Sequence, residues 1–360
     1  MKSTEPVIII GGGLSGLTLA YLLAKKQVQF TLLEASGRLG GRIQTVTGVL
    51  ETPLELGATW FSELHPSLLA LIEELGLQKY PQYSKGKSLF QTNSLEPPQE
   101  FFVPQTDAPS YRLAGGTQLL TDTLIQKIKS ENIHLNISIS AIEDLGDVLK
   151  VESIQGEQFF GNQVFLCLPP QLVSKQIRIT PGLPQALNDV ISEVQTWMAG
   201  SIKFALEYAS PFWREKGFSG MLYSHTGVIA EMYDHTNFEQ EKFGFTGFLN
   251  GGAATHNQEV RKELILQQLS KLLGQEASTP TAYFDKVWTD EFILGGNHII
   301  QRPHQNNGHP LLQKGYLGDK LYFGGTETST QSPGYMEGAV ISAQKNSRLV
   351  PSPIAGKAKN

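Results

Sequence analysis

The first apolar residues of the chain predict a strand, a helix and a second strand. Val7–Ile10 is an unbroken β-branched run, which is typical of a parallel strand buried on both faces. Leucines then recur at helical spacing from Leu14 to Leu23, and Gln29–Leu33 forms the second strand. The short connections between these segments favour a parallel β–α–β crossover.

The rest of the first half alternates between helical and extended patterns. Pro66–Leu75 and Gly116–Ile128 carry apolar residues at helical spacing. Ile133–Ile139 alternates and predicts one half-exposed strand, whereas Val164–Leu168 predicts a buried strand. The segment 79–109 is rich in Pro, Gln and Ser and has weak periodicity, so we expect a loop excursion there.

Near residue 191 the hydrophobic pattern changes from mixed helical and extended segments to mainly extended segments. Ser201–Tyr208 alternates, and glycine, aromatic and turn residues then repeat as far as Asn250, which indicates an antiparallel sheet. Glu259–Leu273 is an amphipathic helix, and the strand Tyr322–Phe323 precedes a closing helix over Gly338–Leu349. The order of these elements predicts an α/β (α+β) protein: a Rossmann-like domain joined to a second, mainly antiparallel-sheet domain.

Length and composition narrow the function classes. The 360 residues are too many for one ordinary core, so we expect two domains. The formal net charge of −5, without a dense Lys/Arg block, argues against a nucleic-acid partner. Cys167 is the one cysteine and lies in a buried strand pattern, so an internal disulfide is excluded, and no His/Asp/Glu spacing suggests a metal.

The chain carries no visible signal peptide and no apolar stretch of the roughly 20 residues that span a bilayer. We therefore expect a cytoplasmic protein that does not bind a membrane.

The turn after the first predicted strand carries a dinucleotide-binding pattern. Gly11-Gly12-Gly13-Leu14-Ser15-Gly16 fits G-x-G-x-x-G and opens a helix, whose free N–H groups favour a pyrophosphate. Glu34 ends the second strand about 20 residues later, where a carboxylate binds ribose hydroxyls. This motif alone does not separate NAD from FAD.

An arginine–glycine extension follows that acid. In Glu34–Arg42, Arg38 and Arg42 flank glycines. Their cationic side chains would be within reach of a pyrophosphate and a flavin. Here the chain resembles the flavin-containing amine oxidases, the monoamine oxidase family. The resemblance implies FAD and a Rossmann-like FAD-binding domain of the glutathione-reductase/amine-oxidase type. It implies cofactor contacts at Gly11, Gly13, Leu14, Ser15, Gly16, Glu34, Ala35, Arg38, Gly41 and Arg42.

The resemblance continues along most of the chain. The segment 56–60 is similar to a flavin-proximal turn, and residues 324–328 and 334–339 are similar to the C-terminal signature of the family. These segments and one apolar position imply further FAD contacts at Gly57, Ala58, Thr59, Trp60, Ile139, Gly325, Thr326, Glu327, Tyr335, Met336 and Ala339. The implied FAD-binding domain comprises 1–78, 112–190 and 289–349, the substrate-binding domain 79–111 and 191–288, and the tail 350–360.

Four positions carry chemistry by this resemblance. Lys203 matches a lysine that holds a water against flavin N5, although a strand lysine taken by itself would be expected to face solvent. Tyr335 matches one of two aromatic walls around the substrate amine, and His298 stands where the family has the second, a tyrosine. Trp288 matches a tryptophan beneath the flavin, but plain core packing would equally explain it.

Asn297 stands where membrane-bound family members have the cysteine that forms a thioether to flavin. The resemblance therefore implies FAD held without that covalent bond.

The implied activity is that of an FAD-dependent amine oxidase. A hydride equivalent passes from the amine α-carbon to flavin N5, the imine hydrolyses, and O2 reoxidises the flavin to give H2O2. Two alternatives stay open: an FAD-dependent desaturase of a large apolar substrate, and a non-enzymatic flavoprotein.

The sequence does not decide whether the amine is a monoamine, a polyamine or an amino acid. It does not decide the oligomeric state either. Arg112, Arg214 and Arg302 are candidates for a carboxylate clamp. Glu231, Asp234 and Glu239 are candidates for an acidic entrance or for solvated strand edges.

Overall fold

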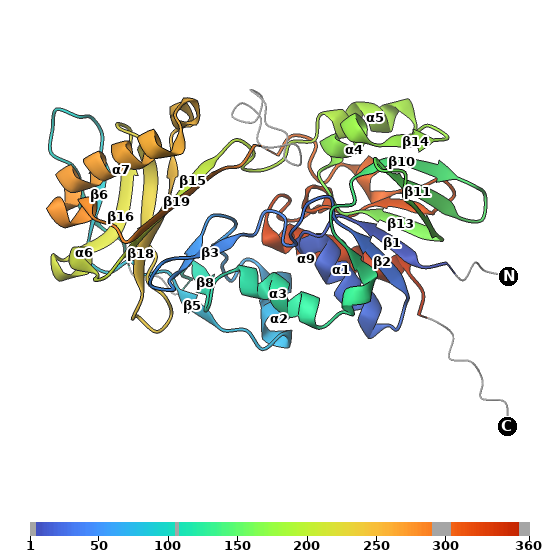
Figure 1. Cartoon of the computed structure of the whole chain (residues 1–360), viewed down its shortest axis with the longest axis horizontal. Coiled ribbons are helices and arrows are strands. Elements are labelled where there is room, and N and C mark those ends of the chain that lie inside the picture. The colour runs from blue at the N-terminus through green and yellow to red at the C-terminus, as the bar shows by residue number, and fades with distance from the viewer. Residues whose placement is uncertain (1–4, 105–107, 290–303, 353–360) are drawn as a thin grey trace.

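The computed structural model describes residues 5–104, 108–289 and 304–352 of the chain. Its main layers are two large sheets, one at each end of the long axis, with smaller elements between them (Figure 1). Within the described ranges, no helix combines the length and the apolar character needed to cross a membrane.

A six-stranded sheet forms the end of the molecule that holds the N-terminus (Figure 1). Its strands pair in parallel except at the β20 edge, which is antiparallel to β21. In spatial order they are β20 (Gly315–Tyr316), β21 (Leu321–Phe323), β13 (Gln163–Leu166), β1 (Val7–Ile10), β2 (Phe30–Leu33) and β9 (Ile133–His134).

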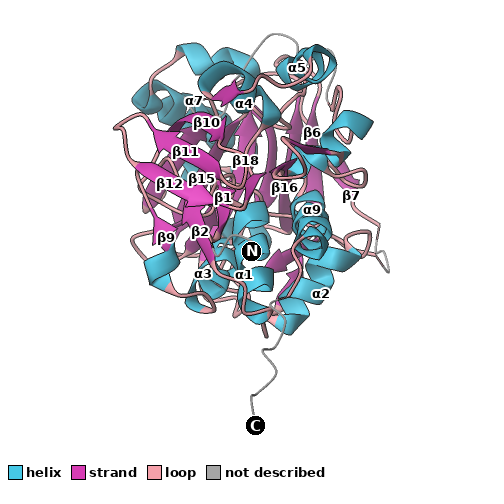
Figure 2. Cartoon of the chain, turned by 90° about the vertical axis from the view of Figure 1, so that its right-hand side faces the viewer, coloured by secondary structure: helices cyan, strands magenta, loops and turns pink. Residues whose placement is uncertain are grey.

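The unbroken apolar run of β1 is explained by its central place in this sheet. Val7 and Ile9 belong to a core shared with α1 (Leu14–Lys25) and α9 (Met336–Leu349), two helices that pack against each other (Figure 2). Ile8 and Ile10 belong to a separate core on the opposite face. Both faces of β1 are thus buried, and the predicted parallel β–α–β unit is confirmed.

A four-stranded sheet covers that opposite face. It contains β12 (Gln158–Gly161), β11 (Leu149–Ser153), β10 (Ile139–Asp144) and β14 (Arg178–Thr180) and packs with α4 (Pro170–Gln176) and α5 (Gln185–Ser192).

The prediction of one strand over Ile133–Ile139 was wrong, because the chain leaves the sheet between β9 and β10. Asn136 has a φ of 61°, outside the extended region. Its N–H donates to the Ser36 carbonyl, and that of Ile137 donates to the Glu34 carbonyl.

A seven-stranded sheet forms the other end of the molecule (Figure 1). Neighbouring strands are antiparallel except β6 and β16, and α7 (Gln258–Leu273) packs on one face. In order they are β19 (Ala282–Val287), β15 (Ile202–Tyr208), β18 (Phe243–Leu249), β17 (Ile229–Asp234), β16 (Phe218–Ser224), β6 (Lys87–Gln91) and β7 (Gln99–Phe102). The predicted antiparallel sheet and the predicted α7 helix are confirmed.

The expectation of a loop excursion over 79–109 was wrong, because this segment supplies β6 and β7 to the large sheet. Ser88, the second residue of β6, is fully buried and shares a 2.7 Å hydrogen bond with Ser219 on β16. A polar pair of this kind stabilises a strand without leaving an apolar pattern in the sequence.

Smaller elements join the two large sheets. They are the hairpin β3 (Thr45–Thr47)/β4 (Pro53–Glu55), the pair β5 (Lys79–Pro81)/β8 (Tyr111–Leu113), and the helices α2 (Pro66–Glu74) and α3 (Gln118–Gln126). The short helix α6 (Phe212–Glu215) instead packs beside β16 at the seven-stranded end (Figure 1). Short 3-10 helices cover Ser130–Asn132, Gly251–Thr255, Gln275–Ser278, Pro310–Gln313 and Thr326–Thr328. The division of the chain into two discontinuous domains stays a prediction.

Candidate functional site

The glycine-rich turn lies between β1 and α1, at the carboxyl edge of the six-stranded sheet. Gly11 has a φ of 109°, and a Cβ there would lie 2.5 Å from the Cys167 carbonyl oxygen. A Cβ on Gly16 would lie 2.0 Å from the Gly11 oxygen. At Gly13 the nearest atom to a Cβ would be 3.9 Å away. The turn is therefore packed tightly against neighbouring backbone at Gly11 and Gly16, whereas there is open space beside Gly13.

A cavity of about 400 Å³ opens beside this turn. It gathers most of the positions at which the resemblance implies FAD contacts. They are Gly11, Gly13, Leu14, Ser15, Glu34, Ala35, Arg38, Gly41, Arg42, Ala58, Ile139, Gly325, Thr326, Glu327, Tyr335, Met336 and Ala339. Four others lie elsewhere: Gly16 is buried behind the turn, and Gly57, Thr59 and Trp60 line a second cavity.

The Glu34 carboxylate is fixed at the mouth of the turn. It accepts hydrogen bonds from the Gly12 N–H at 2.6 Å and from the N–H and hydroxyl of Ser36 at 2.9 and 2.7 Å. These bonds hold the acid at the end of β2, where ribose hydroxyls of a dinucleotide would be expected.

A buried ion pair lines the same cavity and lacks hydrogen-bond partners. Arg42 Nη2 lies 2.6 Å from Glu327 Oε1, and the Glu327 side chain is fully buried. Within the described residues, neither Glu327 oxygen accepts a hydrogen bond and Arg42 Nη1 donates none. Buried polar groups are normally satisfied, so these atoms fit a polar ligand such as the hydroxyl-rich part of FAD.

The C-terminal signature forms the floor of the cavity. Thr326 accepts a hydrogen bond from the Gly334 N–H at 3.0 Å and donates one to the Tyr335 carbonyl at 2.7 Å, which joins both halves of the signature. Helix α9 begins at Met336, which lines the cavity. The N–H groups of the first turn of the helix therefore lie at the cavity wall. Cys167 also lines the cavity, and burial raises the pKa of its thiol to about 12.

A larger cavity of about 1160 Å³ adjoins the first, on the side of the seven-stranded sheet. The two share part of their lining, namely Arg42, Ala58, Trp288, Gly334, Tyr335 and Met336. Tyr335 and Trp288 thus lie where the cavities meet, and the Trp288 indole donates to the Leu56 carbonyl at 2.6 Å. His298 and Asn297 lie outside the described residues.

Lys203 extends from β15 into this larger cavity. Residues Ile202, Phe204 and Leu206 pack in the core beneath α7, so the alternation of the strand directs Lys203 to the other face. The interpretation as a solvent-facing strand lysine is wrong, because only 1% of the residue is exposed. Its ammonium donates to the Gly57 carbonyl at 2.7 Å and to the Thr59 hydroxyl, and it lies 4.8 Å from the Trp60 ring centre.

Burial lowers the pKa of the Lys203 ammonium from its ordinary 10.5 to about 7. The Glu55 carboxylate opposes this effect by its negative charge. Glu55 is itself buried on β4, which raises its pKa, and it accepts bonds from the Thr117 N–H and the Thr45 hydroxyl.

Several cavity residues were missed in the sequence. Trp197 stacks on His304 at 4.4 Å between ring centres, and His304 stacks on Tyr335 at 5.9 Å. Phe248 and Tyr233 line the same cavity from β18 and β17. Aromatic residues were visible in these segments, but their common orientation depends on strand register and on contacts between distant loops.

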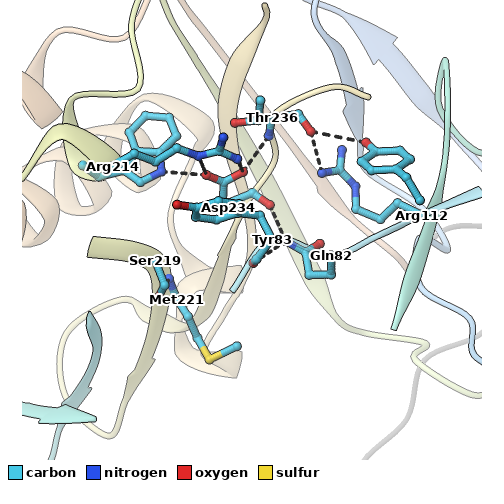
Figure 3. Close-up of polar contacts among 10 residues, drawn as sticks. Gln82, Tyr83, Arg112, Arg214, Ser219, Met221, Asp234 and Thr236 are labelled. Atoms are coloured by element: carbon cyan, nitrogen blue, oxygen red, sulfur yellow. Dashed lines mark hydrogen bonds and ion pairs between the residues drawn. The ribbon is translucent and has the colours of Figure 1, made fainter. Parts of the chain in front are cut away.

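The charged side chains that were candidates for substrate recognition differ in their partners and in whether they line the larger cavity. Arg214 is engaged with Asp234, and Arg112 donates to the Thr236 carbonyl at 2.9 Å while lying over the Tyr80 ring (Figure 3). Glu231 lines the larger cavity, whereas Glu239 is exposed, is not part of its lining and accepts a bond from Asn237 at the cavity edge. Arg302 lies outside the described residues.

Comparisons with known proteins point to one family. A family model described as flavin containing amine oxidoreductase matches residues 14–93 and 90–351. A probable flavin-containing monoamine oxidase A of Dictyostelium discoideum is 23% identical, with 97% of this chain and 98% of that protein covered. The flavin-containing amine oxidase B of Sus scrofa is 26% identical, with coverages of 97% and 86%.

Solved structures share the fold. Putrescine oxidase bound to putrescine superposes with a TM-score of 0.81 at 20% identity, covering 96% of this chain and 98% of the other. Cyclohexylamine oxidase from Brevibacterium oxydans IH-35A gives 0.80 at 21% identity, with the same coverages.

Proposed function

Because this chain belongs to the flavin-containing amine oxidoreductase family, we propose that it oxidises a small-molecule amine, with FAD as cofactor and O2 as electron acceptor. The observation that carries the proposal is the shared lining of the two cavities. Tyr335 and Trp288 border both the cavity that gathers the FAD-binding positions and the larger cavity that contains Lys203. A substrate in the larger cavity would therefore lie against the cofactor.

The cofactor would be held by residues along the whole smaller cavity. Glu34 would bind the ribose, the N-terminus of α1 the pyrophosphate, and the unpaired atoms of Arg42 and Glu327 the polar groups nearer the flavin. The N-terminus of α9 would lie beneath the ring system. No covalent bond is part of this proposal, because Asn297 cannot form a thioether.

Bound FAD supplies the capacity to accept a hydride equivalent from the amine α-carbon and to pass two electrons to O2, giving H2O2. The protein orients the amine against the cofactor through Tyr335 and the rings around it. An aromatic slot favours the uncharged amine, so no strong general base is required.

Lys203 would handle a proton at its Nζ atom beside the cofactor. Its pKa of about 7 allows it to be present both as an amine and as an ammonium near neutral pH. The bonds to Gly57 and Thr59 fix the nitrogen and leave its remaining proton or lone pair for a water in the cavity. We expect this water to serve reoxidation or imine hydrolysis.

Anaerobic mixing of the yellow holoprotein with a panel of primary, secondary and amino-acid amines tests the proposal. Bleaching of the flavin absorbance by one class of amine, followed by recovery of colour and release of H2O2 on admission of O2, is the expected result.

Absence of bleaching with every amine would contradict the proposal. It would favour the desaturase of a large apolar substrate or a flavoprotein without catalytic turnover. Charged side chains in the larger cavity, among them Lys203, Glu231 and Arg112, argue against a purely apolar substrate.

A further inference from the structure

A row of four side chains crosses the seven-stranded sheet and lines the larger cavity. Lys203 on β15 pairs with Phe248 on β18, Phe248 pairs with Glu231 on β17, and Glu231 pairs with Tyr223 on β16. Directly paired residues point to the same face of a sheet. With neighbouring strands about 4.8 Å apart, the Cα atoms of Lys203 and Glu231 lie about 10 Å apart. The row therefore leads from Lys203 to a carboxylate two strands away.

The Glu231 carboxylate is oriented by two tyrosines. The Tyr233 hydroxyl donates to Glu231 Oε2 at 2.9 Å, and the hydroxyls of Tyr223 and Tyr233 share a further hydrogen bond of 2.8 Å. Within the described residues no group donates to Oε1. One oxygen is thus held by the protein, while the other is open to a donor inside the cavity.

The other acidic candidate near the cavity is already neutralised. Asp234 is 1% exposed and accepts from Arg214 Nε and Nη2 at 2.7 and 2.8 Å, from the Trp213 indole at 2.7 Å and from the Thr236 N–H at 2.9 Å (Figure 3). Figure 3 shows the Arg214 guanidinium directly over this carboxylate. Among the described residues that line the cavity, Glu231 is the one acidic side chain.

We propose that the substrate is an aliphatic diamine or polyamine, whose reacting amine lies beside Tyr335 and whose second ammonium binds Glu231. This inference rests on the proposed amine oxidation and names its substrate class. Trp60, Phe248 and Tyr233 line the same cavity as Tyr335 and Glu231, with Trp60 and Tyr233 in edge contact at 4.9 Å between ring centres. A methylene chain packs against such rings, and an ammonium pairs with the open carboxylate oxygen.

A second hollow explains how a longer polyamine would be accommodated. It has a volume of about 640 Å³ and shares Tyr223 and Glu231 with the larger cavity. Glu100 also lines it. The Glu100 carboxylate is already paired with Lys87 at 3.0 Å, so the second hollow offers space for a longer chain rather than a second ammonium site.

A matched pair of substrates tests the inference: hexylamine and 1,6-diaminohexane, which differ only in the second amine. With the holoprotein we expect a KM at least about tenfold lower for the diamine, the effect of one hydrogen bond between charged groups. Glu231→Gln should bring the two KM values together. Glu239→Gln, which removes an acid outside the cavity, should keep the difference.

A conservative variant distinguishes a loss of diamine recognition from a loss of folding. Glu231→Asp keeps the charge but withdraws the carboxylate by one methylene, so the preferred diamine should become longer. Flavin absorbance of each purified variant checks that the holoprotein has formed.

Equal KM values for the two amines in the wild type, or a diamine advantage that survives Glu231→Gln, would overturn the inference and leave amine oxidation standing. Preferred oxidation of α-amino acids would also overturn it and would direct attention to Arg112. Failure of every amine to bleach the flavin would overturn the proposed function, and the inference with it.

Discussion

The ammonium of Lys203 donates a 2.7 Å hydrogen bond to the carbonyl oxygen of Gly57, which joins the seven-stranded sheet to the turn where the two cavities meet. The bond brings a titratable nitrogen next to Ala58, a residue that borders both cavities. Under the proposed function, the sheet would contribute to the cofactor's environment as well as to substrate binding.

Replacement of this nitrogen should slow the reaction while the cofactor stays bound. Lys203→Met keeps the length of the side chain but removes the donor and the proton, so turnover with O2 should fall by about 100-fold, a typical acid–base contribution. Stopped-flow reoxidation and FAD content are the measurements. Lys271→Met, an exposed change on α7, is the control. Wild-type turnover in the Lys203 variant would remove Lys203 from the mechanism.

The pH profile should respond to Glu55. Because the Glu55 charge raises the pKa of Lys203 against the effect of burial, Glu55→Gln should move that pKa below about 7. Glutamine keeps an acceptor for the Thr117 N–H. The wild-type rate of flavin reoxidation should show an ionisation near pH 7, which shifts down in Glu55→Gln and disappears in Lys203→Met. An unshifted profile would show that the two groups are not coupled.

The two glycines of the turn should behave differently. The Gly16→Ala methyl would meet the Gly11 oxygen, so we expect a loss of about 3 kcal/mol in the free energy of unfolding. Gly13→Ala meets nothing closer than 3.9 Å, and the apoprotein should lose less than about 1 kcal/mol. That methyl should nevertheless weaken FAD binding, because it occupies the open side of the turn. Denaturant unfolding of the apoproteins and titration with FAD measure the two effects. Tight FAD binding by Gly13→Ala would contradict the assignment of the pyrophosphate.

The Arg42–Glu327 pair should contribute to cofactor affinity. Glu327→Gln removes a buried charge that pairs with Arg42 and whose second oxygen, Oε2, has no partner among the described residues, so the dissociation constant for FAD should rise at least about tenfold. Fluorescence titration of the apoprotein measures it. Glu131→Gln, on an exposed 3-10 helix, should leave the affinity unchanged. Equal affinities in both variants would assign Glu327 a purely structural role.

Acid precipitation should release FAD into the supernatant. The family resemblance implies that Asn297 stands where membrane-bound members have the cysteine that tethers flavin, so we expect unfolding to remove every contact that retains the cofactor. Absorbance of the supernatant and of the redissolved pellet measures the partition. A yellow pellet would indicate a covalent bond through another residue.

Much of the cofactor cavity could be predicted, because its residues lie in local motifs. Gly11, Gly13, Glu34 and Arg42 belong to one strand–helix–strand segment, and the signature around Tyr335 is continuous in sequence. Such motifs encode their geometry within a few residues, so their positions follow once the strands are recognised.

The substrate cavity could not be predicted in the same way. The row from Lys203 through Phe248 to Glu231 exists only because three strands pair in a particular register, and a shift of one residue would turn each side chain to the other face. Strand β6 was hidden because it is short and one of its two buried residues is Ser88. Burial of Lys203 and Glu55 also depends on contacts between distant segments, which periodicity does not report.

The packing of α9 against α1 has a consequence for biosynthesis. The six-stranded sheet takes β1 from the start of the chain and β21 from residues 321–323, and the Ser15 hydroxyl donates to the Gly324 carbonyl. The nucleotide-binding half therefore remains incomplete on the ribosome until α9 has emerged. Most of the seven-stranded sheet is synthesised between residues 202 and 287 and can pair earlier. Because the nucleotide cleft is the last part of the fold to be completed, we expect FAD to be captured only after α9 has been synthesised.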